Sequence, residues 1–208
     1  MSAVLARVLD YAIVEGAYYG AEPGCHRRSI SIGGSSPFVS SIHLFDAESH
    51  RFPFEDQSFD LVLCCELIEH LVHDPMHLLF EGHRILAPGG HLLLTTPNAV
   101  SLSSVAAVLR GAYNPQVFSR YPRAGNRDTP HVREYTPKEL AVAIEAAGFE
   151  VATLFTSRMA GCDGFGWVRD LLEREGYDTN LRGEQIYCVA PKREGGNCDR
   201  YPSFLYAD

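Results

Sequence analysis

The feature that most constrains the fold is a strand–helix–strand pattern in the middle of the chain. Asp60–Cys65 is a continuous apolar run, which is typical of a parallel strand buried on both faces. Apolar residues at helical spacing predict a helix over Pro75–Leu86, with Asp74 as its N-cap. A Pro-Gly-Gly turn ends that helix, and His91–Thr96 is the next strand. Two strands joined by a crossover helix indicate an α/β domain.

Other segments extend this pattern on both sides. Five of them have the composition of short strands: Ala12–Glu15, Ser29–Ile32, Ile42–Phe45, Phe149–Thr156 and Gln185–Ala190. A helix begins after Thr136, which forms a capping box with Glu139, and another is predicted over Gly164–Glu175. We therefore predict one domain over residues 1–192 and a flexible tail over residues 193–208.

The net charge and the hydropathy of the chain argue against nucleic-acid and membrane partners. The net charge of −8 argues against a large nucleic-acid interface, which usually carries a basic face. No apolar run approaches the ~20 residues that span a bilayer. The first residues lack the basic start and apolar core of a signal peptide. We expect a cytoplasmic protein with no membrane partner and no nucleic-acid partner.

Short motifs occur in a defined order along the chain. They are Phe52–Val62, Glu69–Leu71, Arg84–Gly90, Thr95–Asn98, Glu134–Leu140 and Ala146–Val151. Each is weak alone, but their order over residues 42–192 resembles the class I S-adenosylmethionine (SAM)-dependent methyltransferases. The resemblance implies a doubly wound, Rossmann-like, mostly parallel sheet of seven strands whose last strand is antiparallel. Ligands of such sheets bind beyond the carboxyl ends of the strands.

The same resemblance implies SAM as cofactor and suggests which residues contact it. Asp46 follows the third strand, where the family has an acidic residue that accepts a hydrogen bond from the adenine amino group. The N–H of Ala47 would then meet the adenine ring. The alternative is that Asp46 only caps a turn. After the fourth strand, Cys65, Glu66 and Leu67 would line the methionine part of SAM.

The start of the family's domain has no match in the chain. The family opens with a strand and a glycine-rich turn that lets backbone amides approach SAM. Gly33-Gly34 lies too late, and 45 residues precede Asp46, where a complete domain needs roughly 70–80. Glu15 is the one candidate for the acidic residue that holds the ribose at the end of the second strand. We expect a domain that is incomplete at its N-terminus and binds SAM weakly or not at all.

A second motif suggests a metal site. Glu66, Glu69 and His70 form an E-x-x-E-H run directly after a strand, and His131 follows a long loop. The pattern resembles metal-dependent small-RNA 2′-O-methyltransferases and ubiquinone-pathway O-methyltransferases. In those families, two glutamates and two histidines hold a divalent ion that orients the acceptor hydroxyls. A helix after the fourth strand would bring Glu66, Glu69 and His70 to one face. The alternative is a structural turn in which His70 caps or packs.

The family implies methyl transfer from SAM to an oxygen or nitrogen of a small-molecule or saccharide-type acceptor. Candidate general bases are His70, His73 and His131. The loop over residues 111–130 is long enough to shape the acceptor pocket. The unmatched glycine-rich turn leaves an alternative, namely a non-catalytic or degenerate module that acts through a partner subunit.

Overall fold

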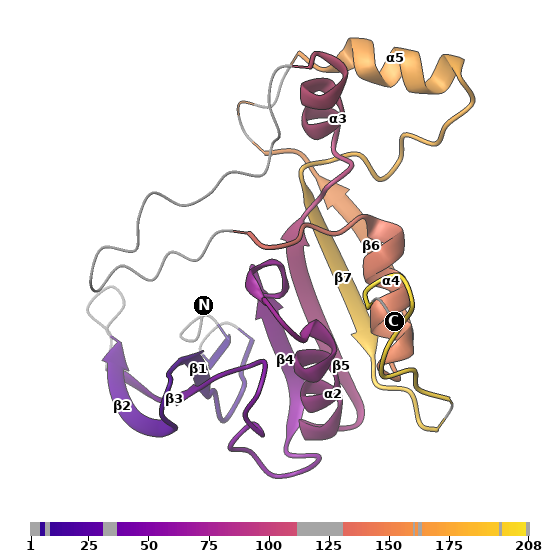
Figure 1. The fold of residues 1–208 in the computed structure, drawn as a ribbon. Helices are drawn as coiled ribbons and strands as arrows, with labels where there is room; N and C mark the ends of the chain where they lie inside the picture. Colours follow the sequence, from indigo (N-terminus) through magenta and orange to yellow (C-terminus); the bar gives the residue numbers. More distant parts are fainter. Residues whose placement is uncertain are drawn as a thin grey trace. The chain divides into compact units, whose positions relative to one another are not determined.

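The computed structural model describes residues 5–6, 9–30, 37–111, 131–159, 161, 164–195 and 197–206. The chain divides into two compact parts, residues 1–54 and 55–208 (Figure 1). Apart from Gly111, the long loop predicted over residues 111–130 lies outside the described residues, as does Gly33-Gly34.

The first part holds a three-stranded sheet in the order β1-β3-β2, made of Gly16–Tyr19 (β1), Gly24–Ile30 (β2) and Phe38–Phe45 (β3). β1 is parallel to β3, and β2 is antiparallel to it. The prediction for the third strand is confirmed at its carboxyl end. The prediction of a strand over Ala12–Glu15 is wrong, because β1 begins one residue after Glu15. The side chains of Phe45 and Phe52 are buried and pack on each other, with ring centroids 4.7 Å apart.

The second part holds a four-stranded sheet in the order β4-β5-β7-β6. Its strands are Phe59–Cys65 (β4), Leu86–Pro97 (β5), Thr153–Ser157 (β6) and Gln185–Pro191 (β7). β4 is parallel to β5, and β7 is antiparallel to both of its neighbours. The antiparallel last strand is therefore confirmed. The seven strands of the described residues lie in two sheets, whereas the sequence predicts one.

The described residues of the second part form five helices: Ile68–His70 (η1, a 3₁₀ turn), Pro75–Ile85 (α2), Leu102–Leu109 (α3), Pro137–Ala146 (α4) and Gly166–Arg174 (α5). Figure 1 shows α2 and α4 over the same face of the sheet. Their side chains Met76, Leu79, Leu140 and Ile144 are fully buried there, and each such burial stabilises the fold by about 1.5–3 kcal/mol. α3 and α5 pack on each other through Ala106 and Val168. Within the described residues, none of these helices has the length and apolar content needed to cross a bilayer.

Strand β5 begins five residues earlier than the predicted His91. Its pairing with β4 is irregular, since Phe59 is opposite Leu86 and Leu61 is opposite His91. This irregular pairing requires a glycine at position 90, because a Cβ there would lie 2.9 Å from the carbonyl oxygen of Ala87. The Pro-Gly-Gly run is therefore an irregular part of the strand and not a turn before it.

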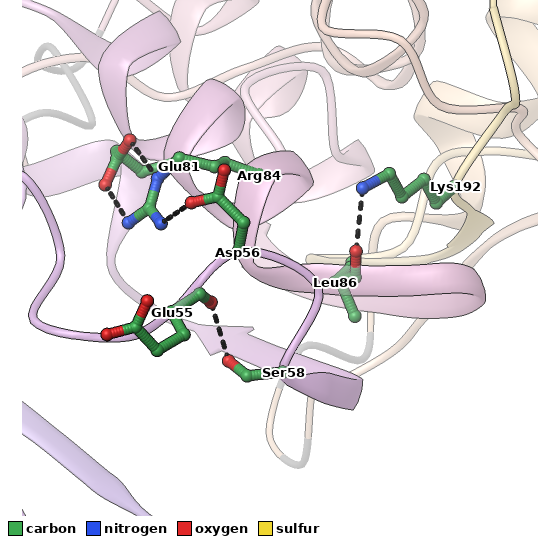
Figure 2. A network of polar contacts seen from close by, with 7 residues as sticks. All are labelled: Glu55, Asp56, Ser58, Glu81, Arg84, Leu86 and Lys192. Atoms are coloured by element: carbon green, nitrogen blue, oxygen red, sulfur yellow. Dashed lines mark hydrogen bonds and ion pairs between the residues drawn. The ribbon is translucent and has the colours of Figure 1, made fainter.

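A polar network ties the end of α2 to the loop before β4 (Figure 2). Arg84 donates to Glu81 at 2.8 and 2.7 Å and to Asp56 at 2.6 Å. Lys192 donates to the carbonyl oxygen of Leu86 at 2.7 Å. The network lies where β4 begins, at the amino end of the strand. It holds the crossover together and takes no part at the carboxyl ends of the strands, where ligands are expected.

The segment predicted as a flexible tail makes specific contacts with the start of α2. Arg200 Nη1 and the Tyr206 hydroxyl donate to Asp74 Oδ1 at 2.9 and 2.7 Å. Arg200 Nη2 also pairs with Asp74 Oδ2. The carbonyl oxygen of Phe204 lies 3.4 Å from Arg133 Nη2. These bonds hold residues 197–206 against the body of the second part.

Candidate functional site

The carboxyl ends of β4 and β5 bring two threonines and two glutamates together. Glu66 N–H donates to the Thr95 carbonyl oxygen at 3.0 Å, which keeps the chain beside β5 after β4 has ended. Thr95 Oγ1 donates to Glu66 Oε1 at 2.8 Å. Thr96 Oγ1 donates to Glu69 Oε2 at 2.9 Å. Successive side chains of a strand point to opposite faces of the sheet. The two carboxylates are therefore held on opposite faces at the end of β5.

The prediction that Glu66, Glu69 and His70 share a helix face is wrong. Glu66 has a positive φ of 51°, which a helix does not contain. Regular turns start only at Ile68 and form the short 3₁₀ helix η1. Glu66 Oε1 also accepts from Gln185 Nε2. Glu66 thus lies exposed on the Thr95 side, apart from the other proposed ligands.

Glu69 is fully buried, with no exposed surface. Its Oε1 lies 3.9 Å from His70 Nε2 and accepts no hydrogen bond from the described residues. Burial raises the pKa of Glu69 above its usual value of 4.5, and the hydrogen bond from Thr96 opposes that rise. A buried carboxylate oxygen without a donor costs free energy unless a cation or a proton meets it. This oxygen is therefore suited to hold a positive charge.

Backbone hydrogen bonds bring His131 to this carboxylate from far along the chain. The N–H groups of Val132 and Arg133 donate to the Glu69 carbonyl oxygen at 2.7 and 3.2 Å. The imidazole of His131 then lies edge-on to that of His70, with ring centroids 4.9 Å apart. No local pattern predicts these hydrogen bonds, because they join residues more than 60 positions apart, although the family resemblance groups His131 with Glu69 and His70.

The segment after His131 is fixed on its other side as well. Ala99 N–H donates to the Tyr135 carbonyl oxygen at 3.0 Å, and the Tyr135 side chain is 1% exposed. Thr136 then caps α4 in the predicted capping box, in which Glu139 Oε2 accepts from Thr136 N–H at 2.9 Å. The position of His131 is thus determined by a buried tyrosine and a well-capped helix.

Among the described residues, Glu69, His70 and His131 form a cluster of potential cation ligands. One ligand atom from each lies within 4.8 Å of the others. Two ligands at about 2.2 Å from one ion lie at most about 4.4 Å apart. A shift of a few tenths of an ångström, within side-chain motion, would let all three reach one cation. One carboxylate and two imidazoles suit a borderline or hard divalent ion such as Zn²⁺ or Mn²⁺. The residues present fit such an ion.

Three of the four proposed metal ligands are therefore together, and Glu66 is not among them. His73, the third candidate base, is exposed and is not part of the cluster. Cys65 and Glu66 are exposed at the end of β4, and Leu67 is half-buried. Their contacts with SAM stay predictions.

Asp46 and Ala47 belong to the first part of the chain. The Asp46 carboxylate accepts from Glu48 N–H and from Ser49 Oγ, both at 2.9 Å. These bonds make Asp46 the cap of a turn at the carboxyl end of β3. A carboxylate has about four acceptor positions, so further hydrogen bonds are possible. The adenine contact of Asp46 and the role of Ala47 stay predictions.

Glu15 lies before β1, at the amino end of the strand, whereas the ribose-binding residue of the family follows its strand. Its Oε2 is 2.9 Å from His43 Nε2 on the neighbouring strand β3. Asp46 follows the opposite, carboxyl end of β3. The ribose contact of Glu15 stays a prediction, but the strand position on which it depends is corrected.

Four residues of this region were missed by sequence reasoning: Thr95, Thr96, Gln185 and Glu134. The two threonines lie inside a quoted motif, and the pleat of a strand implies that they face opposite sides. Glu134 Oε1 lies 3.0 Å from His131 Nδ1 and follows it by three residues. For Gln185 we find no local signal, because its contact with Glu66 crosses 119 positions.

Comparison with known proteins identifies the family. A family model described as a methyltransferase domain matches residues 3–154. The chain belongs to the class I SAM-dependent methyltransferase family, as the order of its motifs predicts.

Two curated relatives illustrate the range of the family. A probable S-adenosylmethionine-dependent methyltransferase of Mycolicibacterium smegmatis is 35% identical over 105 residues, which cover 49% of this chain and 32% of that protein. A ubiquinone biosynthesis O-methyltransferase of Aromatoleum aromaticum is 30% identical over 144 residues, covering 64% of this chain and 58% of that protein. The chain thus spans about a third and under three fifths of the lengths of these relatives.

A solved SAM-dependent methyltransferase of Methanosarcina mazei has a similar fold. Its TM-score is 0.51 at 19% sequence identity, and the match covers 79% of this chain and 74% of that protein. At this identity the likeness concerns the fold alone. It confirms the Rossmann-like α/β class.

Proposed function

We propose that the chain transfers a methyl group from SAM to an oxygen or nitrogen of a small-molecule or saccharide-type acceptor. We further propose that Glu69, His70 and His131 hold a divalent cation that binds the acceptor. The observation that carries this second step is the buried Oε1 of Glu69, which accepts no hydrogen bond from the described residues and lies in the three-residue cluster. Family membership carries the first step.

A cation in this cluster would act as a Lewis acid that orients an acceptor oxygen and lowers the pKa of its hydroxyl group. The residues of the chain supply the rest. Glu69 contributes the negative charge, and Thr96 orients that carboxylate through its hydrogen bond at 2.9 Å. His70 and His131 would contribute imidazole nitrogen ligands from two different segments.

The reaction itself needs little covalent help from the protein. SAM, when bound, would supply a methyl carbon activated by the sulfonium charge, with the neutral thioether as the leaving group. His73, which lies outside the cluster, is a candidate base for the proton of the acceptor. Enzymes of this type contribute mainly proximity and orientation. We propose that Cys65 and Glu66, which are exposed at the end of β4, contact the methionine part of SAM. Asp46 is the residue that we propose for the adenine contact.

Calorimetric titration with SAM, followed by a methyl-transfer assay, tests the proposal. The assay would supply ¹⁴C-methyl SAM and hydroxyl- or amine-bearing small molecules, in chelator and with Mg²⁺, Mn²⁺ or Zn²⁺ added back. Although the unmatched glycine-rich turn predicts weak SAM binding, family membership leads us to expect measurable transfer that chelator abolishes and a metal restores. Glu69→Gln should lose this restoration, while Glu145→Gln, an exposed change on α4, should behave as wild type.

The two steps fail separately. Full activity in chelator would contradict the proposed cation site but not the proposed methyltransferase activity. Absence of SAM binding would contradict the proposed methyltransferase activity and favour the alternative of a non-catalytic module.

A further inference from the structure

We propose that Glu134 is a positioning residue for His131, and that its carboxylate holds the imidazole in the tautomer that presents Nε2 to the cation. The inference rests on the proposed cation site and deepens it. It assigns a role to a residue that contacts neither the acceptor nor the cation but determines how one ligand is presented.

The geometry of the pair is direct. His131 Nδ1 lies 3.0 Å from Glu134 Oε1, within hydrogen-bond distance. The Glu134 side chain is 15% exposed and that of His131 is 37% exposed. The contact is therefore partly shielded from water, which strengthens a hydrogen bond to a carboxylate.

The backbone keeps these two side chains together without a helix. Residues 132 and 133 are bound to the Glu69 carbonyl oxygen, and residue 135 is bound by Ala99 N–H. Glu134 lies between these anchors, so its main chain is held close to His131 and its carboxylate is within reach of the imidazole. The neighbouring Glu139 has a separate task, since it pairs with Arg133 at 2.9 Å and completes the cap of α4.

The hydrogen bond between His131 and Glu134 determines which imidazole nitrogen of His131 carries the proton. A neutral imidazole has one nitrogen that donates and one that accepts. An ionised carboxylate only accepts, so it selects the tautomer with the proton on Nδ1 and the lone pair on Nε2. Histidines that bind metals commonly donate their other N–H to a carboxylate in this way, and loss of that partner weakens metal affinity by about 10- to 100-fold.

The test uses Mn²⁺ as the probe and measures binding without any acceptor. The metal-free chain is titrated with Mn²⁺, and free Mn²⁺ is followed by electron paramagnetic resonance. We expect Glu134→Gln to weaken Mn²⁺ binding by about 10- to 100-fold. Glu145→Gln should retain wild-type affinity. Circular dichroism and the urea midpoint check that each variant is folded.

A second measurement separates positioning from a merely structural role. Nitrogen-15 NMR of the neutral imidazole in the metal-free chain reports which nitrogen carries the proton. We expect the Nδ1–H tautomer to predominate at His131 in the wild type and a mixture of both tautomers in Glu134→Gln. A wild-type mixture, or Mn²⁺ affinity that Glu134→Gln leaves unchanged, would overturn the role of Glu134 while the cation site stands. A wild-type chain that binds no Mn²⁺ would overturn both.

Discussion

Thr95 and Thr96 are consecutive residues of β5, and their hydroxyl groups donate to two different glutamates, Glu66 at 2.8 Å and Glu69 at 2.9 Å. The pleat of the strand directs the two hydroxyls to opposite faces of the sheet. It thereby separates two carboxylates that are three positions apart in the sequence. Glu69 goes to the buried face with the two histidines, and Glu66 stays on the exposed face near Gln185.

This separation predicts different effects of two nearly identical changes. Thr96→Val removes the donor that orients Glu69 and leaves Oε2 without it. We expect Mn²⁺ affinity to fall by about tenfold, equal to about 1.4 kcal/mol, near the upper end of the usual range for one hydrogen bond in a protein. Thr95→Val removes the same group one residue earlier and should leave Mn²⁺ affinity unchanged. Calorimetric titration of both variants is the measurement. Equal losses in both would show that Glu66 belongs to the cation site after all.

Two substitutions can distinguish the two possible roles of Asp46, which are capping the turn and binding the adenine of SAM. If Asp46 binds the adenine amino group, Asp46→Ala should weaken SAM binding by about 1–3 kcal/mol, the usual loss for a hydrogen bond to a charged group. Ser49→Ala removes one hydrogen bond of the turn, that to Asp46 Oδ2, and leaves the carboxylate in place. It should bind SAM as the wild type does. Equal SAM affinity in all three chains would restrict Asp46 to the turn.

The contacts of Asp74 predict a loss of stability in acid. Burial raises the pKa of Asp74, but hydrogen bonds from Arg200, Tyr206 and the His77 amide outweigh burial and lower the pKa from 3.8 to about 2. The unfolded chain therefore binds more protons between these values. The stabilisation is complete above the unfolded pKa and disappears as the pH falls toward about 2. We expect it to amount to about 1–2 kcal/mol.

Urea unfolding between pH 2 and pH 6 measures this dependence. Asp74→Asn keeps an N-cap side chain for α2 but removes the charge. Its stability should vary less with pH over the acid range than that of the wild type. Tyr206→Phe should lose about 1 kcal/mol at neutral pH, because one hydrogen bond to Asp74 is removed. Identical pH profiles for wild type and Asp74→Asn would mean that residues 197–206 do not hold this contact in solution.

The cap of α4 gives a prediction about stability. Thr136 Oγ1 accepts from Glu139 N–H at 3.2 Å, and Glu139 Oε2 accepts from Thr136 N–H at 2.9 Å. Thr136→Ala should lower the free energy of unfolding by about 1 kcal/mol, and Thr136→Ser should restore most of it. Urea denaturation of the two variants measures the effect. A Thr136→Ser chain as unstable as Thr136→Ala would attribute the loss to the methyl group of Thr136 and not to the cap.

Local sequence patterns were enough to predict several elements and the family. The apolar run of β4, the N-cap Asp74 and the capping box at Thr136 are encoded within a few residues of each other, and all three lie where they were predicted. Short-range patterns of this kind need no distant partner, so they can be interpreted before any fold is known. The order of the motifs then indicated the family that the comparison identifies.

Tertiary structure alone decided which predicted residues come together. A helix after β4 would have grouped Glu66 with Glu69, but the hydrogen bonds from Thr95 and Thr96 depend on a strand 29 and 27 positions away. His131 reaches the same site through amides bound to the Glu69 carbonyl oxygen. The early start of β5 likewise depends on its partner strand. Each of these outcomes is set by pairing between segments far apart in the chain, whose free energy no local pattern contains.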